Sequence, residues 1–482
     1  MEASEKKVST RVRGAAWRRK DAPKARGMSF PERHGDKRTA RRYERAMDVM
    51  QLMEARNINE RRKREAYYIC FIFFVFFKHN SFLHIRYVNL LQTSKEREEF
   101  KMKFKTNFKD MREAVVTIGK AVKKNMSPIE ISLVKIEAGE DYVELSTNGS
   151  IGACVKIQAV VEEAGSFVTS FSGINILSVR KCDGDINASN EVNENTLVLK
   201  YRGGKAKTEL AAVDKVFNSV ANPTDDCANV SLPYASLKSM CKDTVFAADD
   251  NVASDLHAIK VNIMDDTDGL LKFTLAACDG KSIAVRTAYA VKEGAYTGEI
   301  LILPDVLKIS LEILETEDEN VKISIGNGKL FMETENARTC FPVLDKNYPD
   351  LNRILNAKKC SFTASIKKDE LIEALNCASY LQQEQKASSG TEGFVSFKFK
   401  ENAVTVGFTG MSQYAEVLDS VTTGELPEQN VLFKTSLIKE IVALYPNNNV
   451  VIGGTTEKNP FWLCCGEHDE YLYCAMPCRL RE

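Results

Sequence analysis

Four cysteines near the C-terminus have the residue type and the grouping that could bind a metal ion. Cys464 and Cys465 are adjacent, and Cys478 follows Cys474 after three intervening residues. Four thiolates can hold zinc in a tetrahedron, but adjacent residues of a strand point to opposite faces and do not easily share one metal ion. The thirteen cysteines show no framework spacing and the chain has no recognisable signal peptide. We therefore expect reduced thiols, no disulfides, and no metal or other cofactor.

Acidic and imidazole side chains offer few further sites for chemistry. Asp265, Asp266 and Asp268 could hold a metal ion, but we favour an acidic turn between two strands. His257 and His468 are the histidines after residue 100, and neither lies in a recognisable nucleophile motif. The sequence also contains no Walker loop, Gly-x-Ser-x-Gly motif or zinc signature. These features argue against catalysis.

Basic side chains are distributed unevenly along a chain whose net charge is zero. Residues 1–100 contain 24 Lys and Arg against 13 Asp and Glu, whereas residues 101–482 contain 42 against 53. An acidic segment of this kind binds nucleic-acid phosphates only where its cations gather on one surface. Basic residues on or beside the expected helices could form such a surface, although each could equally be an ordinary solvated residue. These residues are Lys120, Lys123, Lys124, Arg180, Lys181, Lys238, Lys242, Lys308, Lys367, Lys368 and Lys439.

The elements that would position these side chains occur in three similar sets. Apolar residues at helical spacing predict a first helix beginning near residues 109, 234 and 368, and a second helix beginning near 170, 304 and 436. The period is therefore about 125 to 135 residues. Between the helices, segments such as 395–399 alternate apolar and polar residues, as strands with one buried face do. The sequence thus predicts an α+β fold with repeated domains at 102–226, 227–357 and 358–482.

Residues 1–101 differ in character from the repeats. Residues 1–65 are rich in Arg and Lys and show little sustained apolar periodicity, so a nucleic-acid-binding arm is one interpretation and a disordered or non-native extension is the favoured one. The uncharged segment 66–77 is shorter than the roughly 20 residues of a membrane-spanning helix, and we expect no membrane partner. Lys95–Glu99 can be encoded entirely by purine codons, like a translated ribosome-binding site. This leads to the hypothesis that the functional protein begins at Met102.

Four separated segments carry more specific motifs. They are Asp279–Gly280, Tyr348–Asp350, Asn459–Trp462 and the tail Met476–Leu480. In this order they resemble segments of the bacterial β sliding clamps, the processivity factors of DNA polymerase III. The resemblance implies three clamp domains per chain, each with two helices packed on antiparallel sheet, that together form half of a ring. It also implies a non-catalytic, cytoplasmic protein.

The resemblance further implies a pocket that receives short peptides from partner proteins. An apolar pocket takes Leu or Phe anchors, and a methionine in its wall adapts to several partners. Lys281 and Ser282 stand where relatives often have a basic or polar pair ending in Arg, and several cysteines replace commoner residues, so the preferred peptide motif stays open. The residues implied are Val261, Cys278, Gly280, Ile283, Pro349, Arg353, Ile354, Pro460, Trp462, Cys474, Ala475, Met476, Pro477, Arg479 and Leu480.

By the same resemblance, the lysine-bearing helices line the hole of the ring and touch DNA phosphates without reading base sequence. The expected partners are double-stranded DNA, a replicative DNA polymerase, the clamp loader, other clamp-motif proteins and a second copy of the chain. Two alternatives stay open: a clamp paralogue from a plasmid or phage with other partners, and a non-clamp nucleic-acid enzyme. The residues implied at the dimer interface are Lys205, Thr208, Tyr380 and Leu381.

Overall fold

The computed structural model describes residues 101–125, 132–190, 195–224, 227–266, 270–292, 298–316, 319–356, 358–389, 393–410, 412–465 and 470–478. These residues lie in one compact unit, Glu98–Glu482. The expectations for residues 1–100, Asp268, His468, Arg479 and Leu480, and for the side chains of Lys123 and Lys124, lie outside the described residues. None of the described helices is long and apolar enough to span a lipid bilayer.

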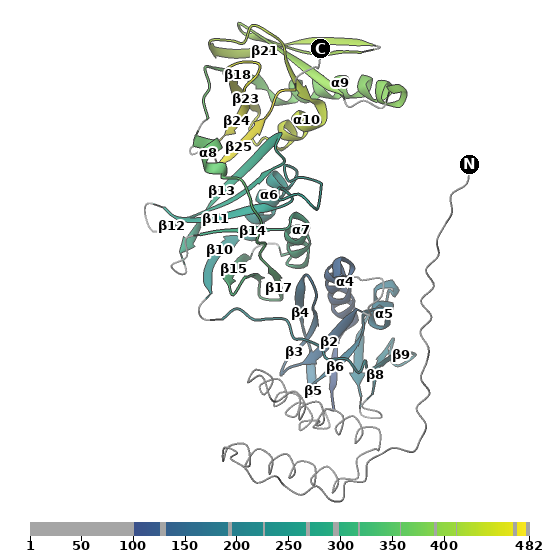
Figure 1. The fold of residues 1–482 in the computed structure, drawn as a ribbon. Helices are drawn as coiled ribbons and strands as arrows, with labels where there is room; N and C mark the ends of the chain where they lie inside the picture. The colour runs from purple at the N-terminus through teal and green to yellow at the C-terminus, as the bar shows by residue number, and fades with distance from the viewer. Residues whose placement is uncertain are drawn as a thin grey trace, which may run out of the picture. The chain divides into compact units, whose positions relative to one another are not determined.

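One order of elements occurs three times in this unit: a strand, a helix, a run of antiparallel strands, a second helix and three more strands (Figure 1). In the first copy, the third strand of the run between the two helices is divided into two strands, β4 and β5. The first copy comprises β1 (Lys103–Asn107), α4 (Phe108–Asn125), β2 (Leu133–Ala138), β3 (Tyr142–Thr147), β4 (Gly152–Gln158), β5 (Val160–Glu163), β6 (Gly165–Ser170), α5 (Phe171–Ile174), η2 (Asn175–Val179), β7 (Asp185–Ser189), β8 (Thr196–Tyr201) and β9 (Ala206–Ala211).

The other two copies keep this order without the division. The second copy comprises β10 (Ala228–Pro233), α6 (Tyr234–Val245), β11 (Ile259–Asp265), β12 (Leu270–Cys278), β13 (Ser282–Lys292), β14 (Gly298–Ile302), α7 (Pro304–Ile313), β15 (Asn320–Gly326), β16 (Lys329–Glu333) and β17 (Ala337–Pro342), followed by the short α8 (Leu351–Asn356). The third comprises β18 (Phe362–Lys367), α9 (Lys368–Ser389), β19 (Phe394–Lys400), β20 (Ala403–Thr409), β21 (Gln413–Gly424), β22 (Val431–Lys434), α10 (Thr435–Leu444), β23 (Asn449–Gly454), β24 (Phe461–Cys465) and β25 (Tyr471–Ala475).

The strands pair in the same way in each copy. In the second copy β11 pairs antiparallel with β12 and β14, and β10 pairs with β13 and β15. The pairs of β2 and β1, and those of β19 and β18, are equivalent. In β19, Val395, Phe397 and Phe399 are at most 4% exposed, while the residues between them point to the other face. The alternation read from the sequence therefore marks the core face of each sheet.

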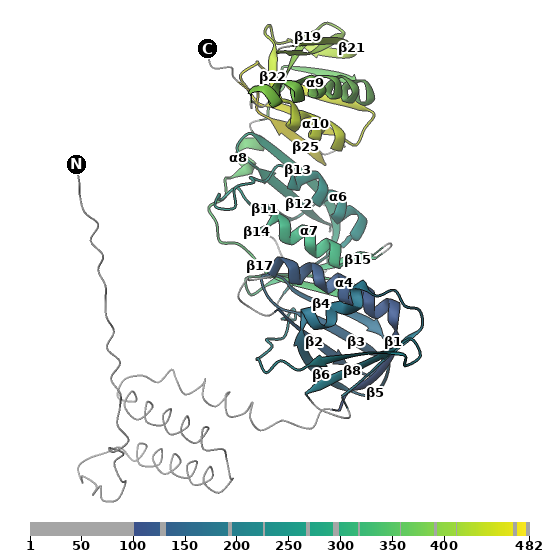
Figure 2. The ribbon, with the colours of Figure 1, turned by 90° about the vertical axis from the view of Figure 1, so that its right-hand side faces the viewer.

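The helices pack on that apolar face (Figure 2). In α9, Leu371, Leu375 and Ala378 are fully buried, as helical spacing predicts. The helix α7 begins at Pro304, where a missing backbone N–H costs no hydrogen bond. The same face of α4 buries Met111, Ala114, Val115, Ile118 and Val122, and that of α6 buries Leu237, Met240, Cys241 and Val245.

The second helix of the first copy, expected to begin near residue 170, is divided into two short helices. The α-helix α5 ends after one turn, and the chain continues as the 3-10 helix η2. The Ser178 hydroxyl donates to the carbonyl of Asn175 at 2.7 Å, and the Arg180 N–H donates to the carbonyl of Leu177 at 3.2 Å. These bonds to the third preceding residue tighten the backbone from α to 3-10 geometry.

Strand pairs also join each copy to the next. Strand β4 of the first copy pairs antiparallel with β17 of the second, with Cys154 opposite Arg338. Strand β13 of the second copy pairs with β25 of the third, with Val285 opposite Leu472. We call these pairings the first junction and the second junction. Each joins the long third strand of one copy to the last strand of the following copy.

Candidate functional site

An apolar row crosses the second junction beneath the residues predicted to bind peptides, and we call it the groove floor. Cys278 of β12 lies opposite Ile283 of β13. Ile283 lies opposite Cys474 of β25, which in turn lies opposite Trp462 of β24. Directly paired residues point to the same face of a sheet, and these four are at most 5% exposed. Their apolar cluster is separate from the main core and also contains Ala276, Val285, Leu351 and Leu472.

The helix α8 and the segment before it cover this floor. Leu351 is buried in the cluster, and Tyr348 and Leu355 pack against it. Burial raises the pKa of the Tyr348 phenol, which is therefore neutral. Ile354 of α8 is 36% exposed and Met476 of the tail is 38% exposed. Exposed apolar side chains beside a buried apolar floor suit the binding of an apolar anchor.

The tail is held in place as far as Cys478. The N–H of Met476 donates to the carbonyl of Lys281 at 2.8 Å, and the N–H of Cys478 donates to the carbonyl of Leu432 at 2.7 Å. Pro477 has no N–H and ends the ladder between them. These bonds hold Met476 beside the start of β13.

The structure brings some predicted pocket residues together and separates others. Val261 is fully buried in the main core, as is Ala475. The period of two along β11 directs Val261 toward the helices, so it lies away from the groove floor. Contact of any of these residues with a peptide stays a prediction. Cys278, Ile283, Trp462 and Cys474 form the floor, Ile354 and Met476 are exposed beside it, and Gly280, Pro349, Arg353, Pro460 and Pro477 lie in or next to the segments that carry these residues.

Sequence reasoning missed several residues of the floor. Ala276, Val285 and Leu472 each lie two positions from a predicted floor residue on the same strand. Strand alternation alone could have identified them. The burial of Leu351 has no comparable local signal, because it depends on where α8 packs.

The thiols in the floor behave as small apolar groups. Burial raises the pKa of Cys474 to about 12 and also raises the pKa of Cys278. Both thiols therefore stay protonated near neutral pH and are poor nucleophiles and poor metal ligands. Within the described residues, no group of three or more His, Cys, Asp or Glu side chains is placed to hold a metal ion.

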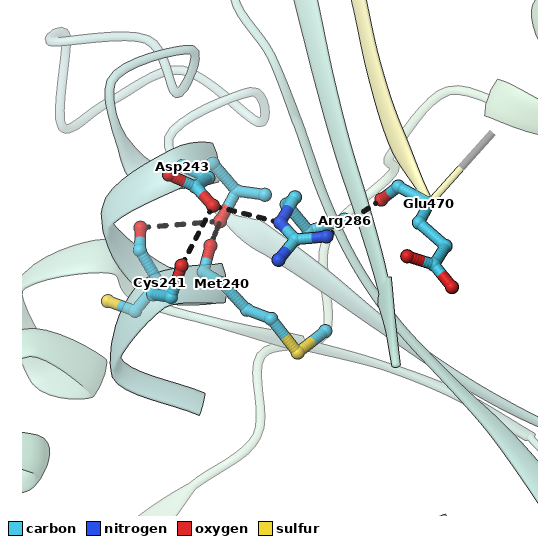
Figure 3. A network of polar contacts seen from close by, with 7 residues as sticks. Met240, Cys241, Asp243, Arg286 and Glu470 are labelled. Carbon is cyan, nitrogen blue, oxygen red and sulfur yellow. Dashed lines mark hydrogen bonds and ion pairs between the residues drawn. The ribbon is translucent and has the colours of Figure 1, made fainter. Parts of the chain in front are cut away.

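A buried ion pair fixes the helix layer to the second junction (Figure 3). Nε of Arg286 donates to Oδ2 of Asp243 at 2.8 Å, and Nη1 of Arg286 donates to the carbonyl of Glu470 at 3.1 Å. The guanidinium carbon lies 3.3 Å from the ring centroid of Tyr471. The Ser239 hydroxyl also donates to Asp243, at 3.1 Å. Arg286 thus links α6, β13 and the start of β25.

The helix side of the second junction contains a cavity of about 790 Å³, away from the groove floor. Residues of α6, α7, α10 and the start of α9 line it. Tyr234, Tyr445 and Tyr471 contribute aromatic walls, and Glu312 and Glu315 contribute acidic ones. Four of the predicted DNA-facing cations reach this cavity: Lys238, Lys242, Lys308 and Lys368.

Several predicted DNA-facing cations make contacts within the protein. Lys120 donates to the carbonyl of Glu312 at 2.7 Å, and Lys238 lies 3.2 Å from a carboxylate oxygen of Glu315. Lys368 donates to the carbonyl of Ala443 in α10 at 3.0 Å and to that of Tyr445, directly after this helix, at 2.6 Å. Lys367 pairs with a neighbouring glutamate on α9. Arg180, Lys181, Lys242 and Lys308 are exposed and Lys439 is half-buried.

The strands equivalent to the junction strands at the two ends of the array each keep an unpaired edge within the described part of the chain. Strand β9 pairs with β8 alone, and the first half of β21, Gln413–Glu416, pairs with β20 alone. Unpaired edges present free N–H and C=O groups to another chain. Of the predicted interface residues, Tyr380 is 66% exposed, Lys205 is exposed, and Thr208 and Leu381 are half-buried.

Repeated two-helix sheets joined edge to edge through their strands define a DNA clamp fold. Residues 231–350 match the family model described as the DNA polymerase III beta subunit, central domain. The chain is similar to the bacterial β sliding clamps in sequence and in fold, and the predicted α+β clamp fold is confirmed.

The individual similarities are modest in identity and broad in extent. The beta sliding clamp of Haemophilus influenzae is 27% identical over 252 residues, which are 52% of this chain and 65% of that relative. That of Streptococcus pneumoniae R6 is 22% identical over 358 residues, 72% of this chain and 90% of the relative. The Bacillus subtilis sliding-clamp crystal structure has a TM-score of 0.70 at 19% identity and covers 79% of this chain and all of that one (100%). The crystal structure of the DNA polymerase III beta subunit from Thermotoga maritima has a TM-score of 0.66 at 18% identity, and it covers 79% of this chain and 100% of that one.

Proposed function

We propose that this chain is a processivity factor for DNA polymerase in the bacterial cytoplasm. Two copies close a ring around duplex DNA, slide along it, and tether a replicative polymerase, the clamp loader and other partners through the groove at the second junction. The role is topological and not catalytic, because a polymerase held on a closed ring stays with its template. The observation that carries the proposal is that two equivalent junctions leave a matching free edge at each end of the array, β9 and β21.

The internal junctions predict the register of the subunit boundary. Paired residues can be followed from strand to strand, starting beside the second helix of each copy. By this count Ala415 of β21 is equivalent to Cys154 of β4 and to Val285 of β13. The same count, started beside the first helix of each copy, makes Lys207 of β9 equivalent to Arg338 of β17 and to Leu472 of β25. Both junctions pair these two positions. We therefore expect Ala415 opposite Lys207 of the partner subunit.

The helix layer supports the same boundary. At the first junction Lys120, the thirteenth residue of α4, contacts the carbonyl of Glu312, the ninth residue of α7. The equivalent positions at the boundary are Tyr380 of α9 and Val179 at the end of η2. Tyr380 is 66% exposed and Val179 is 77% exposed. Packing Tyr380 on Val179 of the partner subunit removes both apolar surfaces from water.

An engineered disulfide tests the boundary and the ring together. A chain carrying Ala415→Cys and Lys207→Cys should form a covalent dimer on mild oxidation, because paired residues on one face bring their Cβ atoms within bridging distance. The control pair Ala415→Cys and Thr208→Cys is out of register by one residue and points to opposite faces. The measurement is the dimer band on a non-reducing gel, compared with the parent chain.

The oxidised ring then tests the topological role. The double variant is loaded on nicked circular DNA by a clamp loader under reducing conditions and is oxidised only afterwards, because a ring closed by disulfides could no longer open. It should then stay bound in high salt and leave once the DNA is cut to a linear form. Sedimentation of the parent chain that shows only monomer at micromolar concentration would contradict the proposed ring. Release of the ring from intact circular DNA at the same rate as from linear DNA would contradict the proposed sliding function.

A further inference from the structure

The first junction contains a second apolar cluster with the same build as the groove floor. Cys340 of β17 lies opposite Phe331 of β16, as Cys474 lies opposite Trp462 at the second junction. Cys154 of β4 joins Cys340 and Phe331 in one cluster that is separate from the main core. These three side chains are at most 6% exposed. The two junctions therefore share a buried floor as well as a strand pairing.

The segment that follows the last strand of the first copy takes the same path as the one that follows the second copy. The backbone N–H groups of Val213 and Leu344 donate, at 3.0 and 2.8 Å, to a carbonyl three residues before the second helix of their own copy. Val220 and Leu351 lie seven residues after these donors. Each is buried in the apolar cluster of the junction with the following copy.

Residues 214–222, which we call the strap, contribute one side chain to the first floor. Asn218 is exposed, whereas Val220 is only 6% exposed. A Cβ atom at Gly152 of β4 would lie 3.0 Å from Cγ1 of Val220, so the glycine leaves the space that the valine occupies. Nδ2 of Asn148 also donates to the carbonyl of Asn218 at 2.7 Å. The strap thus binds its own junction as a short peptide with one apolar anchor would.

Beside this anchor the first junction has a charged residue, Arg338, where β25 of the second has Leu472. Nη2 of Arg338 donates to Sγ of Cys154 at 3.5 Å, and Nη1 lies 3.9 Å from a carboxylate oxygen of Glu333. Nε of Arg338 is buried and has no acceptor among the described residues. A buried donor without an acceptor is unfavourable, and a carboxylate is the strongest acceptor for a guanidinium.

We propose that the first junction is a second peptide site, which the strap closes, and that it receives a partner peptide with an apolar residue beside an Asp or Glu. The apolar residue takes the place of Val220, and the carboxylate accepts from Nε of Arg338. Because the second junction has the apolar Leu472 at this position, the two sites select different peptides. The inference goes beyond the proposed ring and does not depend on its closure.

An opened variant, Val220→Ser, tests the site because it removes the anchor of the strap. The probes are fluorescein-labelled peptides of residues 213–222 in which Ala221, beside the anchor, is replaced by Asp or by Asn. Fluorescence anisotropy should show the Asp peptide binding the opened chain at least roughly tenfold more tightly than the parent, whose own strap competes at high effective concentration. It should also bind the opened chain roughly tenfold more tightly than the Asn peptide does.

Two substitutions in the opened chain test the role of the guanidinium. Arg338→Met should abolish the difference in affinity between the Asp and Asn peptides. Lys398→Met removes an exposed cation from a strand of the third copy and should leave that difference unchanged. Equal affinity of the two peptides for the opened chain, or equal affinity of the Asp peptide for the opened chain and the parent, would overturn the proposal.

Competition locates the bound peptide. An excess of an unlabelled Gln-Leu-x-Leu-Phe peptide, the kind expected at the second junction, should not displace the Asp peptide from the opened chain. Displacement would place the Asp peptide at the second junction and overturn the proposal. These measurements give the same answer for a monomer and for a ring, so their failure is distinct from a failure of the ring.

Thiol alkylation of the parent chain gives a measurement that needs no opened variant. Cys154 lies in the floor that Val220 joins, and Cys241 lies in the main core. Burial raises the pKa of each thiol to about 12, so the two are matched in reactivity once exposed. Opening of the strap should let iodoacetamide modify Cys154 at least roughly tenfold faster than Cys241, as measured by mass spectrometry. Saturating Asp peptide should slow the modification of Cys154 alone, and equal rates for the two thiols would contradict the site.

Discussion

The most constrained side chain of the second junction is Arg286. Its ion pair with Asp243 joins side chains that are 9% and 7% exposed, and its guanidinium also stacks on Tyr471. The buried charge is tolerated because Nε and Nη1 both donate to partners inside the junction. The pair therefore matters more for holding α6 and the two paired strands in one arrangement than for adding stability over an apolar alternative.

Removing one partner of this pair should be costly. Arg286→Met leaves Asp243 buried without its counter-charge and should lower the free energy of unfolding by about 3–5 kcal/mol. The double variant Arg286→Met, Asp243→Leu removes both charges and should recover most of that loss. Urea unfolding followed by circular dichroism measures both. A single variant as stable as the parent would mean that water reaches the junction.

At the scale of elements, the predictable features are those with a local period. The buried positions of α4, α6 and α9 follow from apolar spacing, and so do the strands with alternating burial such as β19. The one-turn α5 and the 3-10 helix η2 were not predictable, because a serine hydroxyl competes for a backbone carbonyl there. The floor of the groove was predictable in part: Cys278 and Cys474 were identified through the resemblance, but Val261 was assigned to the groove although its strand period directs it to the core.

The junctions themselves carry no local signal. Strands β13 and β25 are far apart in sequence, yet Val285 pairs with Leu472. The sequence of either strand does not indicate which edge it will pair with, because all strand edges offer the same backbone N–H and C=O groups. The apolar row across them forms only when both strands are paired. Sequence periodicity could therefore indicate the apolar positions of each strand, but not that the two strands pair.

The predicted peptide site beside α8 and the tail can be tested by substitution. Met476→Ala combined with Ile354→Ala, or deletion of residues 476–482, should weaken binding of a Gln-Leu-x-Leu-Phe peptide, at about 2 kcal/mol or roughly 30-fold for each anchor-contacting residue lost. Ring assembly should be unaffected, because neither residue is on β9 or β21. Fluorescence titration with a labelled peptide measures the effect.

Val160→Ala is the matched control for this experiment. Val160 is 67% exposed and lies in the first copy, so its truncation removes exposed apolar surface without approaching the groove. Equal peptide affinity of the double variant and the parent would place the binding site elsewhere.

At the scale of the whole molecule, the repeats form their own core from Met102 onward. Met102 is fully buried, and its backbone N–H donates to Oδ1 of Asn190 at 2.6 Å. A chain that starts at Met102 keeps this donor as its terminal ammonium group. We therefore predict that residues 102–482 alone unfold at the same temperature as the full chain and assemble equally well.

Calorimetry and sedimentation of the two chains measure this comparison. A lower unfolding temperature for residues 102–482 would show that the preceding residues contribute to the fold. Mass spectrometry of the protein from its native source separately tests the hypothesis that translation begins at Met102, and a mass that includes residues 67–90 would refute it.

The two free edges have a consequence for assembly beyond pairs. Because β9 and β21 are different surfaces, a contact between them would be heterologous, and every copy that joined an open assembly would present a fresh β9 at one end and a fresh β21 at the other. Such contacts give a closed ring when the rotation between copies returns to its start, and a growing filament when it does not. A substitution that alters the angle at either internal junction while leaving both edges intact should therefore yield long fibres, visible by electron microscopy, in place of monomers.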